Sequence, residues 1–196
     1  FYNIFIDVNQ HVLIPRPETE FFVETIINKV EDPKKIVDVG TGSGCIGLSL
    51  AKYFNNAEVH LTDISLEALN VAEKNSNKNE IDVRIYKSNL LKEVRNNDFD
   101  LIVGNLPYIP SNELQELPIE VLNYEPLLAL DGGKDGLDLI AKLVKEANNK
   151  LTNNGLLALE IDSRFGNKVK KLAKDYTKVE IVNDLTGRDR YVFATK

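Results

Sequence analysis

The tetrapeptide Asn105-Leu106-Pro107-Tyr108 follows Phe99–Gly104, an apolar run with the composition of a strand. Pro107 disfavours helical angles at Leu106, so we expect the chain to leave the strand extended, with the Leu106 carbonyl facing a cleft. The Asn105 side-chain oxygen adds a second acceptor, and the Tyr108 ring offers a flat face for stacking. Such acceptors can orient the N–H groups of an amide or aromatic amine and stabilise positive charge as its nitrogen attacks an electrophile.

A glycine-rich loop precedes the tetrapeptide in the chain. The residues from Asp38 to Gly44 follow an expected strand and lead into the apolar helical stretch Cys45–Tyr53. Glycines at this point permit a tight turn and let backbone N–H groups approach a ligand at a helix N-terminus. Asp63 ends the next expected strand, where a carboxylate can accept hydrogen bonds from both hydroxyls of a ribose. The pattern predicts a nucleoside cofactor bound by Asp38, Gly40, Thr41, Gly42, Ser43, Gly44 and Asp63.

Two cofactor classes are compatible with this loop. The stretch Gly42–Gly47 satisfies G-x-G-x-x-G, so a dinucleotide, and with it an NAD-dependent oxidoreductase, has to be considered. The leading Asp38 and the string Asp-x-Gly-x-Gly-x-Gly are more typical of enzymes that use S-adenosyl-L-methionine. The amino group of that cofactor suits a nearby carboxylate, whereas a diphosphate does not. Together with two acceptors for a nitrogen, the loop favours an N-methyltransferase.

Composition narrows the class of partner. The chain has 196 residues, 43% of them hydrophobic, and a formal net charge of −6. This charge argues against a partner held mainly through phosphates, so we expect no direct nucleic-acid binding. The single cysteine excludes an internal disulfide, no apolar run is long enough to span a membrane, and the isolated His11 and His60 predict no metal site. We expect a cytoplasmic monomer that binds no membrane.

Apolar, β-rich runs alternate with helical patterns, which predicts βαβ units around a mostly parallel sheet. The expected strands are Lys35–Val39, Ala57–Thr62, Val83–Lys87, Asp100–Gly104, Leu156–Ile161, Val179–Asn183 and Tyr191–Ala194. The expected helices are Thr19–Val30, Cys45–Tyr53, Leu66–Asn75, Leu137–Leu151 and Lys168–Tyr176.

Three connections carry further expectations. The turn Asp184–Asp189 is too short for a parallel crossover, so the last strand is expected to run antiparallel. The weak alternation of Phe1–Val12 suggests a small N-terminal hairpin. The segment from Pro107 to about Asp135 is too long for an ordinary connection, and such loops are usually functional or disordered. The predicted fold is a Rossmann-like α/β domain with helices on both faces of a seven-stranded sheet.

Four segments of the chain resemble the catalytic domain of the release-factor glutamine methyltransferases, the HemK family. They are Leu13–Glu20 with Ile-Pro-Arg-Pro-Glu-Thr-Glu, Asp38–Gly44, Asn105–Pro110, and Glu125–Leu137 with Gly-Gly-x-Asp-Gly-Leu. The C-terminal Leu159–Ile161 and Gly187–Val192 fit as well, so the resemblance spans nearly the whole chain. It implies a class I S-adenosylmethionine-dependent methyltransferase that modifies the glutamine side-chain amide in the Gly-Gly-Gln motif of peptide chain release factors.

The resemblance also implies residue roles. Asp63, Ile64, Asn105 and the glycine loop would hold the cofactor, with Asn89 and Leu90 beside its adenine. The substrate glutamine would contact Asn105, Leu106, Pro107, Tyr108, Arg16 and Pro17, and Pro15–Thr19 would close over the site. Two positions depart from the family pattern: Leu106 replaces a proline and Asn89 replaces an aspartate. The family's N-terminal helical domain is absent, so we expect residues 1–196 to form one catalytic domain, with 1–16 as hairpin and lid segment.

One alternative substrate and the role of one residue stay open at this point. Asn-Leu-Pro-Tyr is also similar to the motif of ribosomal RNA adenine-N6 dimethyltransferases, and adenine N6 is likewise a conjugated amine. The net charge and the Pro-Arg-Pro-Glu segment favour the glutamine substrate over adenine in ribosomal RNA or DNA. Glu160, at the end of a buried-type strand, is equally compatible with a functional and a structural role.

Overall fold

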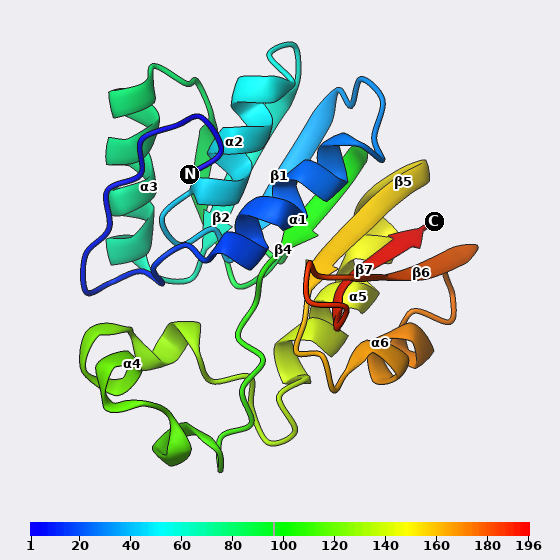
Figure 1. Cartoon of the computed structure of the whole chain (residues 1–196). Coiled ribbons are helices and arrows are strands. Elements are labelled where there is room, and N and C mark those ends of the chain that lie inside the picture. The colour runs from blue at the N-terminus through cyan, green and yellow to red at the C-terminus, as the bar shows by residue number, and fades with distance from the viewer. Residues whose placement is uncertain (96) are drawn as a thin grey trace.

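The computed structural model describes residues 1–95 and 97–196, which form a seven-stranded sheet flanked by helices on both faces (Figure 1). The strands are β1 (Lys35–Val39), β2 (Glu58–Asp63), β3 (Arg84–Lys87), β4 (Phe99–Gly104), β5 (Leu151–Glu160), β6 (Lys178–Asn183) and β7 (Asp189–Thr195). The helices are α1 (Pro17–Ile27), α2 (Cys45–Tyr53), α3 (Leu66–Asn79), α4 (Ile119–Tyr124), α5 (Asp138–Lys150) and α6 (Gly166–Leu172). Short 3₁₀ turns are η1 (Leu114–Glu116) and η2 (Leu127–Ala129).

The strand order is β3-β2-β1-β4-β5-β7-β6. The pairings among β1 to β5 are parallel, whereas β7 runs antiparallel to both β5 and β6, which confirms the predicted antiparallel last strand. The direction in which successive strands are added reverses between β1 and β4. In open α/β sheets, ligands bind beyond the carboxyl ends of the strands at such a reversal.

Side chains alternate between two cores, one on each face of the sheet. Ile36 of β1 packs with Phe22 of α1 and Leu48 of α2, while its neighbour Val37 packs with Ile140 of α5. Full burial of each such aliphatic or aromatic side chain stabilises the fold by roughly 1.5–3 kcal/mol. The two cores hold the carboxyl ends of β1, β4 and β5 in a fixed relation.

Several element boundaries differ from the sequence prediction for identifiable reasons. Helix α1 begins at Pro17 because proline is well suited to the first position of a helix, where its missing N–H costs nothing. Strand β5 begins at Leu151 because Asn154 and Gly155, which resemble a turn in the sequence, lie within an irregular stretch of the strand. Asn154 adopts a left-handed φ of 66°.

The predicted N-terminal hairpin is wrong. Residues 1–12 contain turns but no strand, and they lie along α3. The backbone groups of Asp7 exchange two hydrogen bonds of 2.9 Å with the Asn75 side chain, and those of Phe5 exchange two of 2.9 and 2.7 Å with the Asn79 side chain. Two asparagines one helical turn apart thus satisfy the backbone groups that a partner strand would have paired.

The long segment after Pro107 is ordered, and Figure 1 shows it as a separate lobe containing α4 beyond the end of β4. A bridge between Ile109 and Asp131, outside the sheet, joins the two ends of this segment. In the described part of the chain, no helix is both long enough and apolar enough to cross a membrane.

Candidate active site

Strand register brings the predicted site residues together. Val39 pairs with Gly104 on β4, and Gly104 pairs with Leu159 on β5. Because these strands are parallel, the residues that follow them emerge side by side at one edge of the sheet. The glycine loop, Asn105 and Glu160 therefore meet although they are far apart in the chain.

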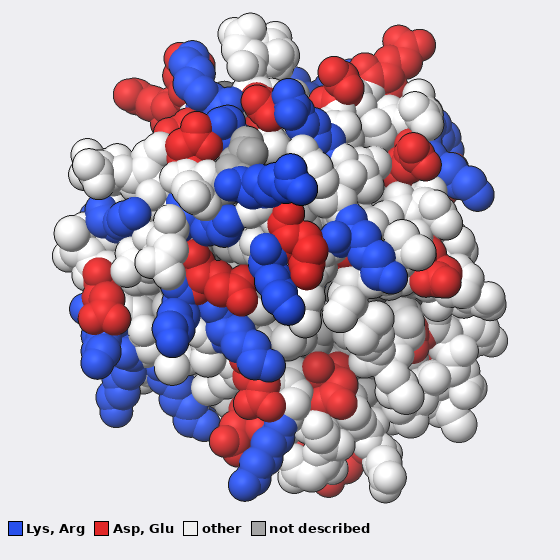
Figure 2. Space-filling model, turned by 180° about the vertical axis from the view of Figure 1, so that it is seen from behind, with Lys and Arg blue, Asp and Glu red and all other residues white. Residues whose placement is uncertain are grey.

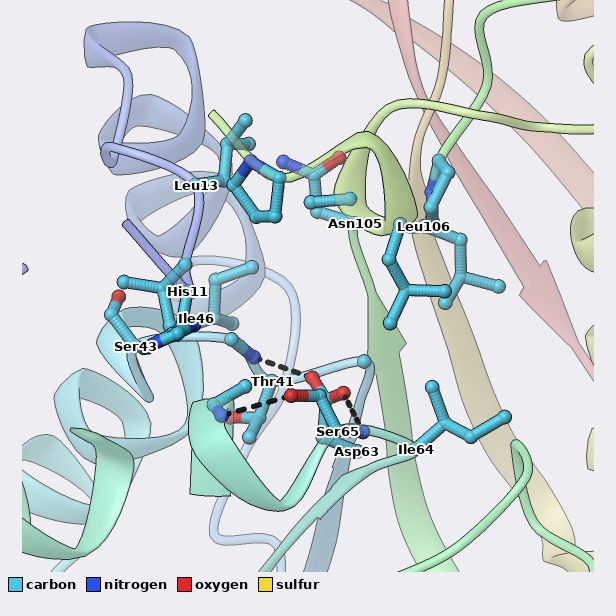
Figure 3. A pocket seen from close by; sticks show the side chains of 18 of the residues that line it. His11, Leu13, Thr41, Ser43, Ile46, Asp63, Ile64, Ser65, Asn105 and Leu106 are labelled. Atoms are coloured by element: carbon cyan, nitrogen blue, oxygen red, sulfur yellow. Dashed lines mark hydrogen bonds between the residues drawn. The ribbon is translucent and has the colours of Figure 1, made fainter. Parts of the chain in front are cut away.

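The glycine loop is shaped by residues that a side chain would disturb. Gly40 and Gly42 have φ values of 70° and 55°, and a Cβ on Gly40 would lie 2.8 Å from a Leu106 methyl carbon. Asp63 fixes the loop from below: one carboxylate oxygen accepts from the Gly42 amide at 3.0 Å and the other from the Ser65 amide at 2.9 Å (Figure 3). Burial raises the pKa of Asp63 above its usual value.

Asp38 and Gly44 lie behind the loop and do not line the cavity in front of it. One Asp38 oxygen accepts from the Thr41 hydroxyl at 2.6 Å and from the Gly47 amide at 2.9 Å, which ties the loop to the first turn of α2. Burial raises the pKa of this carboxyl to about 6. The other Asp38 oxygen is buried and has no partner among the described residues.

A cavity of about 370 Å³ opens in front of the loop, within the range of small-molecule sites. Asp63 lies on one side of it, with Asn105 and Leu106 on another (Figure 3). The other predicted cofactor residues that line it are Gly40, Thr41, Gly42, Ser43, Ile64, Asn89 and Leu90. The described lining contains no lysine or arginine, so a diphosphate would meet the Asp63 carboxylate without a compensating cation. A positively charged sulfonium cofactor fits this lining better.

Part of the cavity wall was missed in the sequence. His11, Val12 and Leu13 line it because the N-terminal segment is held against α3, and Ile46 lines it from α2. Nothing in the local sequence signals these contacts, since they depend on where the N-terminal segment packs.

A second cavity of about 180 Å³ adjoins the first, and both are lined by Asn105, Leu106 and Pro107. Tyr108, Arg16 and Glu160 line the second cavity alone, as expected for a substrate side. Pro17 lines neither cavity; it begins α1 instead. The tetrapeptide therefore stands where a cofactor chamber and a second chamber meet.

An ion pair closes one side of the second cavity. The Arg16 guanidinium donates to Glu125, whose side chain is only 3% exposed. Arg16 precedes α1 and Glu125 follows α4, so the contact joins the segment before α1 to the lobe after Pro107. The segments Leu13–Glu20 and Glu125–Leu137, far apart in the chain, therefore meet at one cavity.

Two glycines hold the backbone of the tetrapeptide in place. A Cβ on Gly132 would lie 2.8 Å from the Pro107 carbonyl oxygen, and one on Gly136 would lie 2.3 Å from the Tyr108 carbonyl oxygen. Gly136 also has a φ of 71°. The Gly-Gly-x-Asp-Gly segment thus allows close approach of two backbone stretches.

We expect Gly136→Ala to lower the free energy of unfolding by roughly 2–5 kcal/mol, because it adds left-handed strain and a clash with Tyr108. Gly187→Ala is the matched control: its φ is 82°, but nothing lies within 4 Å of its Cβ position. The control should lose only about 1–2 kcal/mol. Urea unfolding of both variants measures the difference, and equal losses would contradict close packing at Gly136.

Glu160 is the residue whose role the sequence left open. Its side chain is almost fully buried at the end of β5, and its Oε2 has no partner among the described residues. Burial raises the pKa of Glu160 to about 7, while the nearby Thr19 and Asn105 side chains and Arg190 oppose the rise. A carboxyl that titrates near neutrality beside a candidate catalytic amide is a functional candidate.

We expect Glu160→Gln to stabilise the protein above pH 7 by on the order of 2–3 kcal/mol. Glu160 titrates near 4.5 when unfolded and near 7 when folded, so the wild-type free energy of unfolding falls as pH rises between these values. The neutral variant lacks this loss and should match the wild type below pH 4.5. Urea unfolding at several pH values measures the free energy of unfolding. The same pH dependence in both proteins would contradict a raised pKa of Glu160.

The fold and cavity define a class I S-adenosylmethionine-dependent methyltransferase. The Methyltransferase small domain family matches residues 17–120. A methyltransferase from Pyrococcus furiosus shares the fold with a TM-score of 0.74 and 24% identity, over 98% of this chain and 88% of that one. The N-terminal domain of human METTL16 in complex with SAH gives a TM-score of 0.66 at 18% identity, over 100% and 76% of the two chains.

Sequence similarity narrows the class. A release factor glutamine methyltransferase from Flavobacterium psychrophilum is 41% identical over 98% of this chain and 70% of its own length. One from Moorella thermoacetica is 42% identical over 99% and 71%. The chain belongs to the release factor glutamine methyltransferase family.

Proposed function

We propose that the protein transfers a methyl group from S-adenosylmethionine to the side-chain amide nitrogen of the glutamine in the Gly-Gly-Gln motif of peptide chain release factors. The observation that carries this proposal is the position of the Asn105 and Leu106 acceptors at the junction of the two cavities. The names of the relatives support the substrate. We further propose that residues 1–196 act as one catalytic domain, as a monomer in the cytoplasm.

The first cavity holds the cofactor in this proposal. Asp63 accepts hydrogen bonds from the ribose hydroxyls, since its carboxylate lines the cavity and is already oriented by the Gly42 and Ser65 amides. Ile64, Asn89 and Leu90 contact the adenine. Asp38 acts indirectly, by fixing the loop that faces the amino-acid moiety. S-adenosylmethionine, when bound, supplies an electrophilic methyl group on a sulfonium.

Asn105 and Leu106 grip the substrate amide. The Asn105 amino group donates to the Thr19 hydroxyl at 3.3 Å, which leaves Oδ1 to accept one N–H of the glutamine amide. The Leu106 carbonyl accepts the other. These contacts direct the weakly nucleophilic nitrogen toward the methyl group and strengthen as positive charge develops on it. The methylated nitrogen then loses a proton to water. The Tyr108 ring forms part of the wall of the second cavity.

Leu106 fulfils this role without the ring of the family's proline. Its side chain is 3% exposed and sits against Gly40, where a Cβ would be only 2.8 Å from it. Pro107 restricts Leu106 to extended angles from the other side. Packing and the following proline together hold the carbonyl that the missing ring would have pre-set.

The surface beside the second cavity suits a protein substrate. Ile119 and Tyr124 of α4 are 67% and 70% exposed, and Leu127 and Leu128 follow them. Figure 2 shows that the side of the molecule where α4 lies carries few basic side chains. Exposed apolar groups are favourable contacts for a polypeptide, whereas a nucleic acid would require clustered lysines and arginines.

Labelled-methyl transfer tests the proposal. The chain is incubated with S-adenosylmethionine carrying a labelled methyl group and, in parallel, with an unmethylated release factor, the same factor with its motif glutamine replaced by alanine, and ribosomal RNA. Label on the first substrate alone supports the proposal. Label on RNA would replace it with adenine methylation, and label on the alanine variant would place the methyl group elsewhere in the factor.

A further inference from the structure

Glu160 has no role in the proposed methyl transfer as described so far, yet it lies beside Asn105, which binds the substrate amide in that proposal. It ends β5 next to Asn105, because Gly104 and Leu159 are paired in register, and it lines the same chamber. Its Oε2 is buried without a partner among the described residues. A buried carboxyl oxygen without a hydrogen-bond partner lowers the free energy of unfolding, so we expect a functional role for this side chain.

Thr19 stands between the two side chains. Its hydroxyl is buried, with the residue 2% exposed, and it accepts a hydrogen bond from the Asn105 amino group at 3.3 Å. A hydroxyl that accepts can donate its own proton to a second acceptor. The Glu160 carboxylate is the nearby acceptor: it ends β5 beside Asn105, and hydrogen bonds from both the Thr19 and the Asn105 side chains oppose the rise in its pKa.

We infer that Glu160 is a positioning residue that, together with Thr19, holds the Asn105 side-chain oxygen toward the substrate. An ionised carboxylate only accepts hydrogen bonds, so the Asn105 amino group donates toward Thr19 and Glu160, and the Thr19 hydroxyl donates to Glu160. This direction turns the Asn105 oxygen away from Thr19 and into the chamber. The role rests on the proposed function, since the orientation matters only if Asn105 receives an amide N–H.

Protonation of Glu160 allows the hydrogen bonds to run in the opposite direction, from Glu160 toward Asn105. A neutral carboxyl can donate to Thr19, and Thr19 can then donate to the Asn105 oxygen, which turns the amino group toward the substrate. An amino group cannot accept the substrate N–H and repels it. Lowering the pH through the pKa of Glu160, about 7, should therefore weaken catalysis without removing any side chain.

Other charged and titratable groups surround Glu160. They are Glu18 of α1, Cys45 of α2, Tyr108 after β4, Arg190 and Tyr191 of β7, and Arg16 and Glu125 across the chamber. Burial raises the pKa of Cys45 and of Tyr108 to about 12, so both stay protonated at neutral pH. The pH response assigned to Glu160 is thus separable from theirs by substitution.

Nuclear magnetic resonance of the free protein tests the relay without substrate. In the ¹⁵N-labelled wild type, the Asn105 side-chain NH₂ signals should shift with pH with a midpoint near 7. Glu160→Gln should abolish this titration and Thr19→Val should reduce it, whereas Thr19→Ser, which keeps the hydroxyl, should retain it in full. Signals that titrate equally in wild type and Glu160→Gln would overturn the inference.

Methyl transfer to the release factor supplies the second readout. The wild-type kcat should fall below pH 7, and Glu160→Gln should lower kcat by on the order of tenfold to a hundredfold, with the acidic limb lost and the KM for the cofactor kept. The Glu160→Gln/Thr19→Val double variant should be no slower than the slower single variant, because both break one relay. Glu180→Gln, on the edge strand β6 and ion-paired with Lys29, should leave the profile unchanged.

The outcomes separate the two proposals. A Glu160→Gln enzyme that keeps the acidic limb and the wild-type kcat shows that the carboxyl is structural only. An Asn105 titration in the free protein without methylation of the release factor supports the relay and refutes the proposed substrate.

Discussion

Replacement of Asn105 by alanine is expected to slow methyl transfer by about two to three orders of magnitude, or roughly 2–4 kcal/mol of transition-state stabilisation. In the proposed function, the side chain supplies one of two acceptors for the substrate amide at the junction of the two cavities. Cofactor affinity should change little, because Asp63 and the glycine loop hold the cofactor from the opposite wall.

Two measurements separate chemistry from binding in this variant. Single-turnover transfer of a labelled methyl group gives the rate, and calorimetric titration with S-adenosylmethionine gives the affinity. Asn149→Ala, on the exposed surface of α5, controls for loss of an asparagine as such. Near-normal turnover of Asn105→Ala would show that the amide grip is wrong. Loss of cofactor affinity would instead move Asn105 to the cofactor side.

Replacement of Asp63 by alanine is expected to weaken S-adenosylmethionine binding by about 3–5 kcal/mol, which corresponds to two to four orders of magnitude in Kd. The variant loses the acceptors for the ribose and also frees the Gly42 amide that the carboxylate holds at 3.0 Å. Hydrogen bonds to a charged group contribute about 1.5–3 kcal/mol each, so both losses are substantial.

Calorimetry of the free enzyme measures this effect directly. Asp63→Asn is the matched variant, because it keeps the shape and one acceptor oxygen and should bind with intermediate affinity. If Asp63→Ala bound S-adenosylmethionine with wild-type affinity, Asp63 would not contribute to cofactor binding. A parallel titration with NAD should give no binding heat, since the described cavity lining has no cation for a diphosphate.

Local sequence was sufficient where the physics is local. The alternation of apolar runs predicted every strand of the sheet, and β1 and α2 agree with the predicted boundaries. The glycines of the loop and the Pro107 restriction act through the backbone of their own segment, so their conformational consequences could be derived without neighbours. The short turn before β7 likewise dictated its antiparallel direction.

The N-terminal hairpin failed because its pairing partner is not local. The alternation of Phe1–Val12 resembles a strand, but Asn75 and Asn79 of α3 satisfy its backbone groups instead. These asparagines read as ordinary polar positions on a helix. The contact matters for the site, since it places His11 and Leu13 at the cavity wall.

The sequence by itself determined the Rossmann-like fold class, the glycine loop with Asp63, and the tetrapeptide Asn105-Leu106-Pro107-Tyr108 as a candidate site, because each depends on residue types at short spacing. Only the tertiary structure decided that β7 lies between β5 and β6, that Asp38 supports the loop from behind, and that Glu160 stands beside Asn105. Strand order and register are set by packing of the two cores. They are therefore global properties, and the ionisation of a buried carboxyl depends on them.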